Sequence, residues 1–124
     1  MVRDYCAYVR RYSLKEYSPA VQKVMNYVNL NVAEPLTLKS LAAMCFISPS
    51  YLSALFKQET GTTLIDYINT QRVNRAAPLL EHSSHAIAAV AEEVGILDVN
   101  YFTKILKKTL GVTPTRYRRE HKEK

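Results

Sequence analysis

Three polar residues near the C-terminus, Asn100, Thr103 and Lys104, have the spacing of one face of a helix. The asparagine amide can form two hydrogen bonds with adenine, the lysine can reach the acceptors of guanine, and the threonine offers a hydroxyl and a methyl group. Lys107 and Lys108 lie farther along the same predicted helix and suit phosphate groups. This face has the chemistry to contact a nucleic acid, and a solvated charged surface is the alternative interpretation of the lysines.

The segment that carries these residues repeats an earlier one. Segment 100–118 reads NYFTKILKKTLGVTPTRYR, and segment 50–68 reads SYLSALFKQETGTTLIDYI. The identical positions are Tyr51/Tyr101, Lys57/Lys107, Gly61/Gly111, Thr63/Thr113 and Tyr67/Tyr117. Before these segments, an apolar pattern restarts at an offset of 49 residues (Leu38, Leu41, Ala42, Cys45 against Ile87, Val90, Ala91, Val94). Because the offset is 50 from Tyr101 onward, we expect one extra residue in the second turn.

The outward positions of the first copy carry mostly short side chains. The candidates for nucleic-acid contact there are Ser48, Pro49, Ser50, Ser53, Ala54 and Lys57. Serine hydroxyls can donate to phosphates or bases at close range, whereas Ala54 can contact only a thymine methyl. We therefore expect weak direct base readout by this copy, with a larger share from water and DNA shape.

Charge separates the two copies as well. The whole chain carries a net charge of +6, from 17 Lys and Arg against 11 Asp and Glu. Segment 50–68 holds one base and two acids, a net −1, whereas segment 100–118 holds five bases and no acid, a net +5. Phosphate attraction should thus come mainly from the second copy. At the start of the last predicted helix, Thr113, Thr115 and Arg116 could hold a phosphate through backbone N–H groups and the guanidinium.

Helix start and stop signals place these faces on helices, and no strand-like alternation is sustained. Serine or threonine caps, several followed by proline, predict helix starts at Ser18-Pro19, Thr37, Ser48-Pro49 and Thr113-Pro114, and Asp98 predicts another. Gly61 and Gly95 predict helix ends. A longer helix follows Thr63, and the sequence leaves open whether Pro78 kinks or breaks it.

The predicted fold is all-α, with two helix-turn-helix lobes joined by a linker helix and about seven helices. We assign residues 18–62 to the first lobe, 63–82 to the linker helix and 83–124 to the second lobe. In the first lobe we expect the inner side of the third helix to carry Tyr51, Leu52, Leu55 and Phe56. We expect Tyr67 to anchor the core of the first lobe and Tyr117 to anchor the core of the second.

These residues resemble the DNA-binding domain of the AraC/XylS family of bacterial transcription regulators, in the branch found at the C-terminus of two-component response regulators. The resemblance runs through LTLKSLA (36–42), SPSYLSALFKQETG (48–61), DYINTQR (66–72), AIAAVAEEVG (86–95), DVNYFTKILKKTLGVTP (98–114) and RYR (116–118). Ile96 and Leu106 stand where the family usually has aromatic residues, and both are changes of one apolar core residue for another. Arg72 matches the arginine of the family's linker helix, and we favour a structural ion pair over a base contact for it.

The resemblance implies sequence-specific binding of double-stranded DNA. Two recognition helices, about residues 48–59 and 98–110, would enter successive major grooves of an asymmetric site. It also implies a receiver or sensor domain before residues 1–17, which would be the tail of a linker, and RNA polymerase as a partner. No cofactor is implied.

Other classes of function fit the residues less well. A helical RNA-binding domain and a protein-interaction domain remain as alternatives, although the aromatic residues fall mostly on inner faces rather than on a stacking surface. No catalytic motif appears, and His82, His85 and His121 are too scattered for a metal site. Two cysteines, Cys6 and Cys45, and the lack of an apolar run or signal peptide favour a reduced, cytoplasmic setting without a membrane partner.

Overall fold

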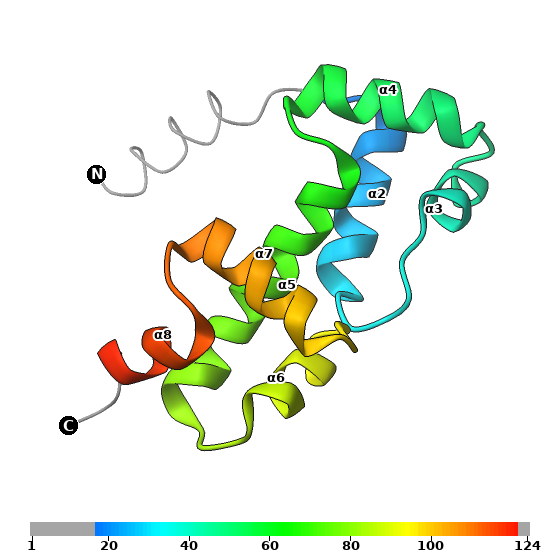
Figure 1. The fold of residues 1–124 in the computed structure, drawn as a ribbon. Coiled ribbons are helices and arrows are strands. Elements are labelled where there is room, and N and C mark those ends of the chain that lie inside the picture. The colour runs from blue at the N-terminus through cyan, green and yellow to red at the C-terminus, as the bar shows by residue number, and fades with distance from the viewer. Residues whose placement is uncertain (1–16, 122–124) are drawn as a thin grey trace, which may run out of the picture.

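The computed structural model describes residues 17–121, and these residues form seven α-helices without a strand (Figure 1). The all-α prediction is therefore confirmed for this part of the chain. The predicted linker tail, residues 1–17, lies outside the described residues except for Tyr17. In chain order the helices are α2 (Pro19–Leu30), α3 (Leu38–Met44), α4 (Pro49–Thr60), α5 (Leu64–His82), α6 (Ile87–Glu93), α7 (Val99–Leu110) and α8 (Pro114–Glu120).

Most helices begin at the residues that the capping pattern predicts. The side chains of Thr37, Ser48, Asp98 and Thr113 each accept a backbone N–H of the first turn that follows. Ser18 is the exception, because its hydroxyl makes no capping bond although α2 does begin at Pro19. Its backbone N–H instead donates to Oε1 of Glu59 in α4 at 2.8 Å. The start of α2 is thus held by a tertiary contact where a local cap is expected.

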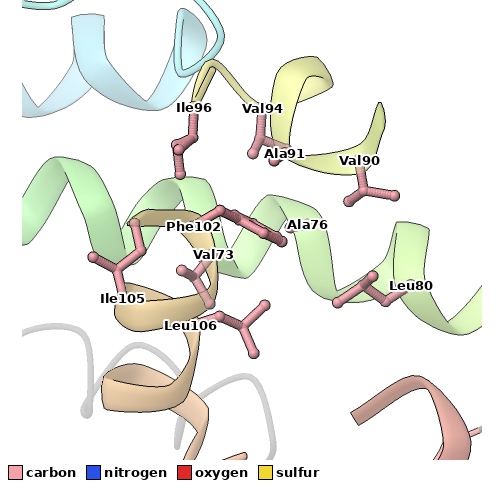
Figure 2. Close-up of a cluster of buried hydrophobic side chains, with 10 residues drawn as sticks. All are labelled: Val73, Ala76, Leu80, Val90, Ala91, Val94, Ile96, Phe102, Ile105 and Leu106. Carbon is pink, nitrogen blue, oxygen red and sulfur yellow. The ribbon is translucent and has the colours of Figure 1, made fainter. Parts of the chain in front are cut away.

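Two separate hydrophobic cores lie on either side of the middle of α5. In the first lobe, Val21, Val24 and Val28 of α2 pack with α3 and α4 and with Leu64 and Ile68 of α5. Figure 2 shows the second core, in which Val73, Ala76 and Leu80 of α5 pack against residues of α6, the turn after it and α7. In Figure 1 α5 accordingly runs from one group of helices into the other. Both lobes are built on this helix, which passes from one core to the other between Ile68 and Val73.

Pro78 does not interrupt α5, which continues as one helix from Leu64 to His82. The break considered from the sequence is therefore absent. Pro78 lies between Ala76 and Leu80, two residues that are fully buried in the second core. This proline thus lies in the part of the linker helix that packs on the second core, beyond the point where α5 leaves the first core.

The repeat includes a third helix that the sequence pattern did not reveal. Helix α2 contributes three buried residues to the first core, Val21, Val24 and Val28. Helix α5 contributes three residues to the equivalent place in the second core, Val73, Ala76 and Leu80. The offset between these two triplets is 52 residues, against 49 and 50 for the helices that follow. Because the offset changes and α5 also serves the first lobe, comparison at one fixed spacing misses this pair.

The turns between the paired helices differ at one position. Gly95 has φ +92°, and Phe46, which precedes it by 49 residues, has φ +61°. A Cβ on Gly95 would lie 2.9 Å from the carbonyl oxygen of Val32 and 3.0 Å from that of Ala33. Glycine is required there because the loop after α2 packs directly on this turn. Phe46 meets no such neighbour and is 92% exposed.

Candidate nucleic-acid interface

Helix α7 presents its predicted polar face to solvent and its apolar face to the second core. Phe102, Ile105 and Leu106 are buried, whereas Asn100, Lys104, Lys107 and Lys108 are exposed and Thr103 is half-buried. Asp98 holds the start of the helix, because its Oδ1 accepts the backbone N–H of Asn100 at 2.9 Å and that of Tyr101 at 3.4 Å. The cap and the core thus fix α7 so that its basic face points outward.

An open groove of about 430 Å³ runs between this face and the first half of α5. Lys104 and Lys108 of α7 and Asp66 and Asn69 of α5 are among its lining residues. The Lys108 ammonium lies 3.9 Å from the Asp66 carboxylate, and both side chains are largely exposed. Lys104 therefore lines the groove without an ion pair to any acid of residues 17–121, while Lys108 already has a carboxylate partner across the groove.

Tyr101 connects α7 to α5 at the same groove. Its hydroxyl accepts a hydrogen bond from the Asn69 amide at 2.9 Å, and 42% of the side chain is exposed. The equivalent residue of the first lobe, Tyr51, is 56% exposed, so its predicted inward position is wrong. Leu52 and Phe56 already fill the first core, which leaves Tyr51 outside it. An exposed tyrosine on α4 is a contact candidate that the apolar pattern concealed.

The outer face of α4 has the short side chains expected from the sequence. Ser48, Pro49, Ser50, Ser53, Ala54 and Lys57 are all exposed. Ser48 is also occupied as the cap, because its hydroxyl accepts the N–H of Tyr51 at 3.1 Å. This face permits close approach of a partner but supplies one cation, Lys57.

The start of α8 offers less to a phosphate than the sequence indicates. Pro114 has no N–H and is buried, and the N–H of Arg116 is bound by the Thr113 hydroxyl at 3.2 Å. The Arg116 guanidinium donates to the Glu120 carboxylate at 2.8 Å, and this contact lowers the pKa of Glu120. Among the first three residues of α8, Thr115 alone keeps a backbone N–H that no capping bond uses.

Arginines of α5 hold the two lobes together through backbone carbonyls. Nε of Arg72 donates to the Val32 oxygen and Nη2 to the Glu34 oxygen, both at 2.8 Å. Arg75 donates to the Asn29 oxygen at 3.1 Å. The role of Arg72 is structural as expected, but it forms hydrogen bonds to carbonyl groups and no ion pair with any acid of residues 17–121. Its partners are carbonyl groups at the end of α2 and in the following loop, which no sequence pattern marks.

In residues 17–121 no single helix is long and apolar enough to cross a membrane, and α3 with α4 meets that requirement only as a pair bent by 90°. The same residues include no group of three or more His, Cys, Asp or Glu side chains placed to hold a metal ion.

Comparison with known proteins gives matches over most of the chain. A family model described as a helix-turn-helix domain matches residues 41–120. The bifunctional transcriptional activator and DNA repair enzyme AdaA of Bacillus subtilis (strain 168) is 39% identical over 102 residues, which cover 82% of this chain and 48% of AdaA. The chain spans about a third to a half of the length of the curated relatives it matches.

Solved structures match the fold closely. The C-terminal domain of AraT, a response regulator from Geobacillus stearothermophilus, has a TM-score of 0.83 at 35% identity, covering 89% of this chain and 92% of that one. The DNA-binding domain of AdpA, solved in complex with a target DNA, has a TM-score of 0.76 at 26% identity, covering 83% and 93% of the two chains. The chain is therefore a helix-turn-helix domain of the AraC/XylS family of transcription regulators.

Proposed function

We propose that the chain binds double-stranded DNA sequence-specifically, with α4 and α7 in successive major grooves of one asymmetric site. The observation that carries the proposal is the outer face of α7, where exposed Asn100, Lys104, Lys107 and Lys108 lie on a helix held from behind by its core. The similar AdpA domain was solved with its target DNA, which supports DNA binding here. Two such helices would meet the duplex about one turn, or ~34 Å, apart.

Helix α7 would make more of the base and phosphate contacts than α4. In α7 we assign base contacts to Asn100, Thr103 and Lys104, and phosphate contacts to Lys107 and Lys108. At the start of α8 we assign a backbone phosphate to Thr113, Thr115 and Arg116, chiefly through the unused N–H of Thr115. In α4 we assign close, mostly shape-dependent contacts to Ser48, Pro49, Ser50, Ser53, Ala54 and Lys57.

The whole protein would be a bacterial transcription regulator that works in the cytoplasm and is not an enzyme. Residues 18–62 and 83–124 would be its two reading lobes, joined by 63–82. Residues 1–17 would lead from a receiver or sensor domain, which the likeness to the AraT response regulator supports. RNA polymerase would be its partner on the promoter.

A competition experiment tests the proposal. The domain is bound to labelled duplex DNA selected from a random pool, and unlabelled duplex DNA or RNA of equal length is added at the same salt concentration. We expect duplex DNA to displace the probe at much lower concentration than RNA. Equal displacement by RNA would indicate the RNA-binding alternative. Association with a protein partner that survives replacement of both Lys104 and Lys107 by alanine would indicate a protein-interaction domain.

A further inference from the structure

A pocket at the C-terminal end of α5 is lined by a charged side chain, Arg118. The equivalent position of the first lobe holds an apolar side chain. The pocket has a volume of about 680 Å³ and is lined by the end of α5, the loop after it and α8. Its polar lining consists of Glu81, His82, Ser83, Ser84, Thr115, Arg118 and Arg119. It lies outside the groove beside α7, and of its lining residues Thr115 alone belongs to the proposed DNA contacts.

Equivalent hydrogen bonds in the two lobes show which residue Arg118 replaces. The hydroxyl of Tyr67 donates to Asn29 at 3.0 Å in the first lobe, and that of Tyr117 donates to Glu81 in the second. The Tyr67–Asn29 pair of the first lobe is equivalent to the Tyr117–Glu81 pair of the second. The residues that directly follow the two tyrosines are therefore equivalent as well. In the first lobe that residue is Ile68, which is 3% exposed in the core. In the second lobe it is Arg118.

The Arg118 guanidinium is only partly satisfied in its place. Nε donates to the Leu80 carbonyl at 3.1 Å, but Nη2 is buried and has no acceptor among residues 17–121. Burial of an unpaired charged donor costs more than burial of the isoleucine found in the other lobe. Because Arg118 stands where the other lobe has a core isoleucine, core packing alone does not explain this arginine.

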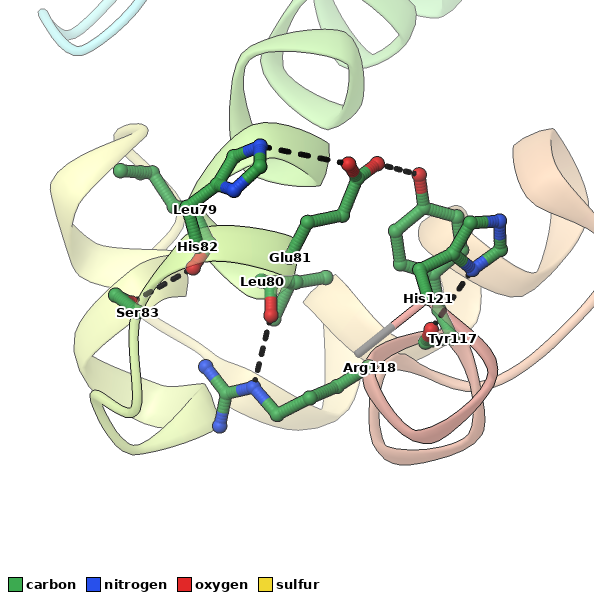
Figure 3. Close-up of polar contacts among 8 residues, drawn as sticks. All are labelled: Leu79, Leu80, Glu81, His82, Ser83, Tyr117, Arg118 and His121. Carbon is green, nitrogen blue, oxygen red and sulfur yellow. Dashed lines mark hydrogen bonds and ion pairs between the residues drawn. The ribbon is translucent and has the colours of Figure 1, made fainter. Parts of the chain in front are cut away.

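The surroundings of Arg118 favour an anion. Figure 3 shows the Glu81 carboxylate between Tyr117 and His82, pointing away from the Arg118 guanidinium. The Leu79 carbonyl is bound by Ser83, and the Leu80 carbonyl is bound by Arg118 itself. The Glu81 carboxylate and the carbonyls of Leu79 and Leu80 are therefore already used. Arg119, Thr115 and Ser84 add a second cation and two hydroxyl donors.

We propose that this pocket binds a phosphate group, held by the guanidinium of Arg118 with Arg119 and the hydroxyls of Thr115 and Ser84. Arginine recognises phosphate through paired N–H donors, and its Nη groups remain for that purpose while Nε holds Leu80. The phosphate has two possible sources, a small phosphorylated molecule and the backbone of bound DNA. Phosphate binding does not require DNA binding, so the two proposals can fail separately.

The test follows the Arg118 Nε–Hε resonance by NMR, together with the melting temperature of the domain. Sodium phosphate is titrated against sodium chloride at equal ionic strength, and duplex DNA is titrated separately. We expect a saturable shift of the Arg118 signal and a rise of roughly 5 °C in melting temperature at about ten times Kd. A response to free phosphate assigns a small-molecule source, and a response to DNA alone assigns the DNA backbone.

The variant Arg118→Ile installs the residue of the first lobe. It should fold with an unchanged or higher melting temperature in chloride and lose the response to phosphate and DNA at this site. Arg118→Gln, which keeps a donor for Leu80, should lose the response as well. Lys39→Gln removes a cation from α3 and should keep it. The proposal is overturned if neither phosphate nor DNA shifts the Arg118 signal, or if both Arg118 variants retain the rise in melting temperature that sodium phosphate causes.

Discussion

At the level of single residues, the two recognition helices differ in the side chains that can reach a base. Lys104 is exposed at the groove beside α5, whereas the corresponding residue of α4 is Ala54. The sequence predicts this difference because outward positions on a capped helix follow from its spacing. It does not predict that Lys108 contacts Asp66, because that contact depends on how α7 lies against α5.

Replacement of Lys104 by alanine should therefore weaken DNA binding and relax base preference at one half-site. If Lys104 contacts a base, we expect a loss of roughly 1–3 kcal/mol in binding free energy. Ala54→Gly is the matched change in α4 and should alter specificity little beyond its effect on helix stability. Gel-shift titrations with matched and mismatched duplexes measure both. Equal specificity losses would contradict the unequal roles of the two helices.

Tyr117 gives a second prediction at this scale, about stability at high pH. Partial burial, together with the hydrogen bond to Glu81 and its negative charge, raises the pKa of Tyr117 from 10.0 to about 12. Because the folded state holds this proton more tightly than the unfolded state, the stabilisation is complete below pH ~10 and is lost as pH rises towards ~12. The free energy of unfolding should fall less over this range in Tyr117→Phe than in the original chain. Identical pH dependence of denaturant unfolding in the two proteins would contradict this assignment.

At the level of elements, local signals and tertiary contacts make separate contributions. Thr37, Ser48, Asp98 and Thr113 cap their helices as predicted, because each cap needs only a side chain and the N–H groups of the next turn. Ser18, Tyr51 and Arg72 depart from prediction because Glu59, the filled first core and the loop after α2 determine their surroundings. Single-sequence patterns do not report such neighbours.

Gly95, in the turn before α7, allows a direct test of the contact between this turn and the loop after α2. Gly95→Ala should lower the free energy of unfolding more than Gly61→Ala, although both glycines have a positive φ. The added methyl group at Gly61 meets nothing within 4 Å, whereas at Gly95 it lies 2.9 Å from the Val32 oxygen. We expect a loss of about 1 kcal/mol at Gly61 from the backbone alone, and a larger loss at Gly95. Equal losses in urea unfolding would show that the loop after α2 does not press on this turn.

At the level of the whole molecule, α5 and its bonds determine how the two lobes are placed. Arg72 and Arg75 hold the end of α2 and its following loop, and Asn69 holds Tyr101 of α7. All these residues precede Pro78, so the proline lies outside the set of bonds between the lobes. The two-lobed arrangement was predictable from the repeat, but the shared use of α5 was not, since the offset of its second half differs from those of the other helices.

The ion pair across the groove predicts an effect on binding. Asp66→Asn should raise affinity for DNA roughly twofold to fivefold at low salt, because Lys108 loses an exposed partner and the groove loses a negative charge. Folding stability should change little, because both side chains are exposed. In the background of Lys108→Ala the gain should shrink, which a double-mutant cycle measures. An equal gain without Lys108 would show that the pair does not compete with phosphate.

The central claim is that two unequal lobes read one asymmetric DNA site, and single-base scanning of that site tests it most directly. A preferred duplex is selected from random DNA, every base pair is changed in turn, and affinities are measured for the original domain and for Lys104→Ala. We predict two half-sites about one helical turn apart, with larger penalties in the half-site whose preferences Lys104→Ala relaxes. Equal penalties in both half-sites, or larger ones in the half-site that Lys104→Ala leaves unchanged, would contradict the account.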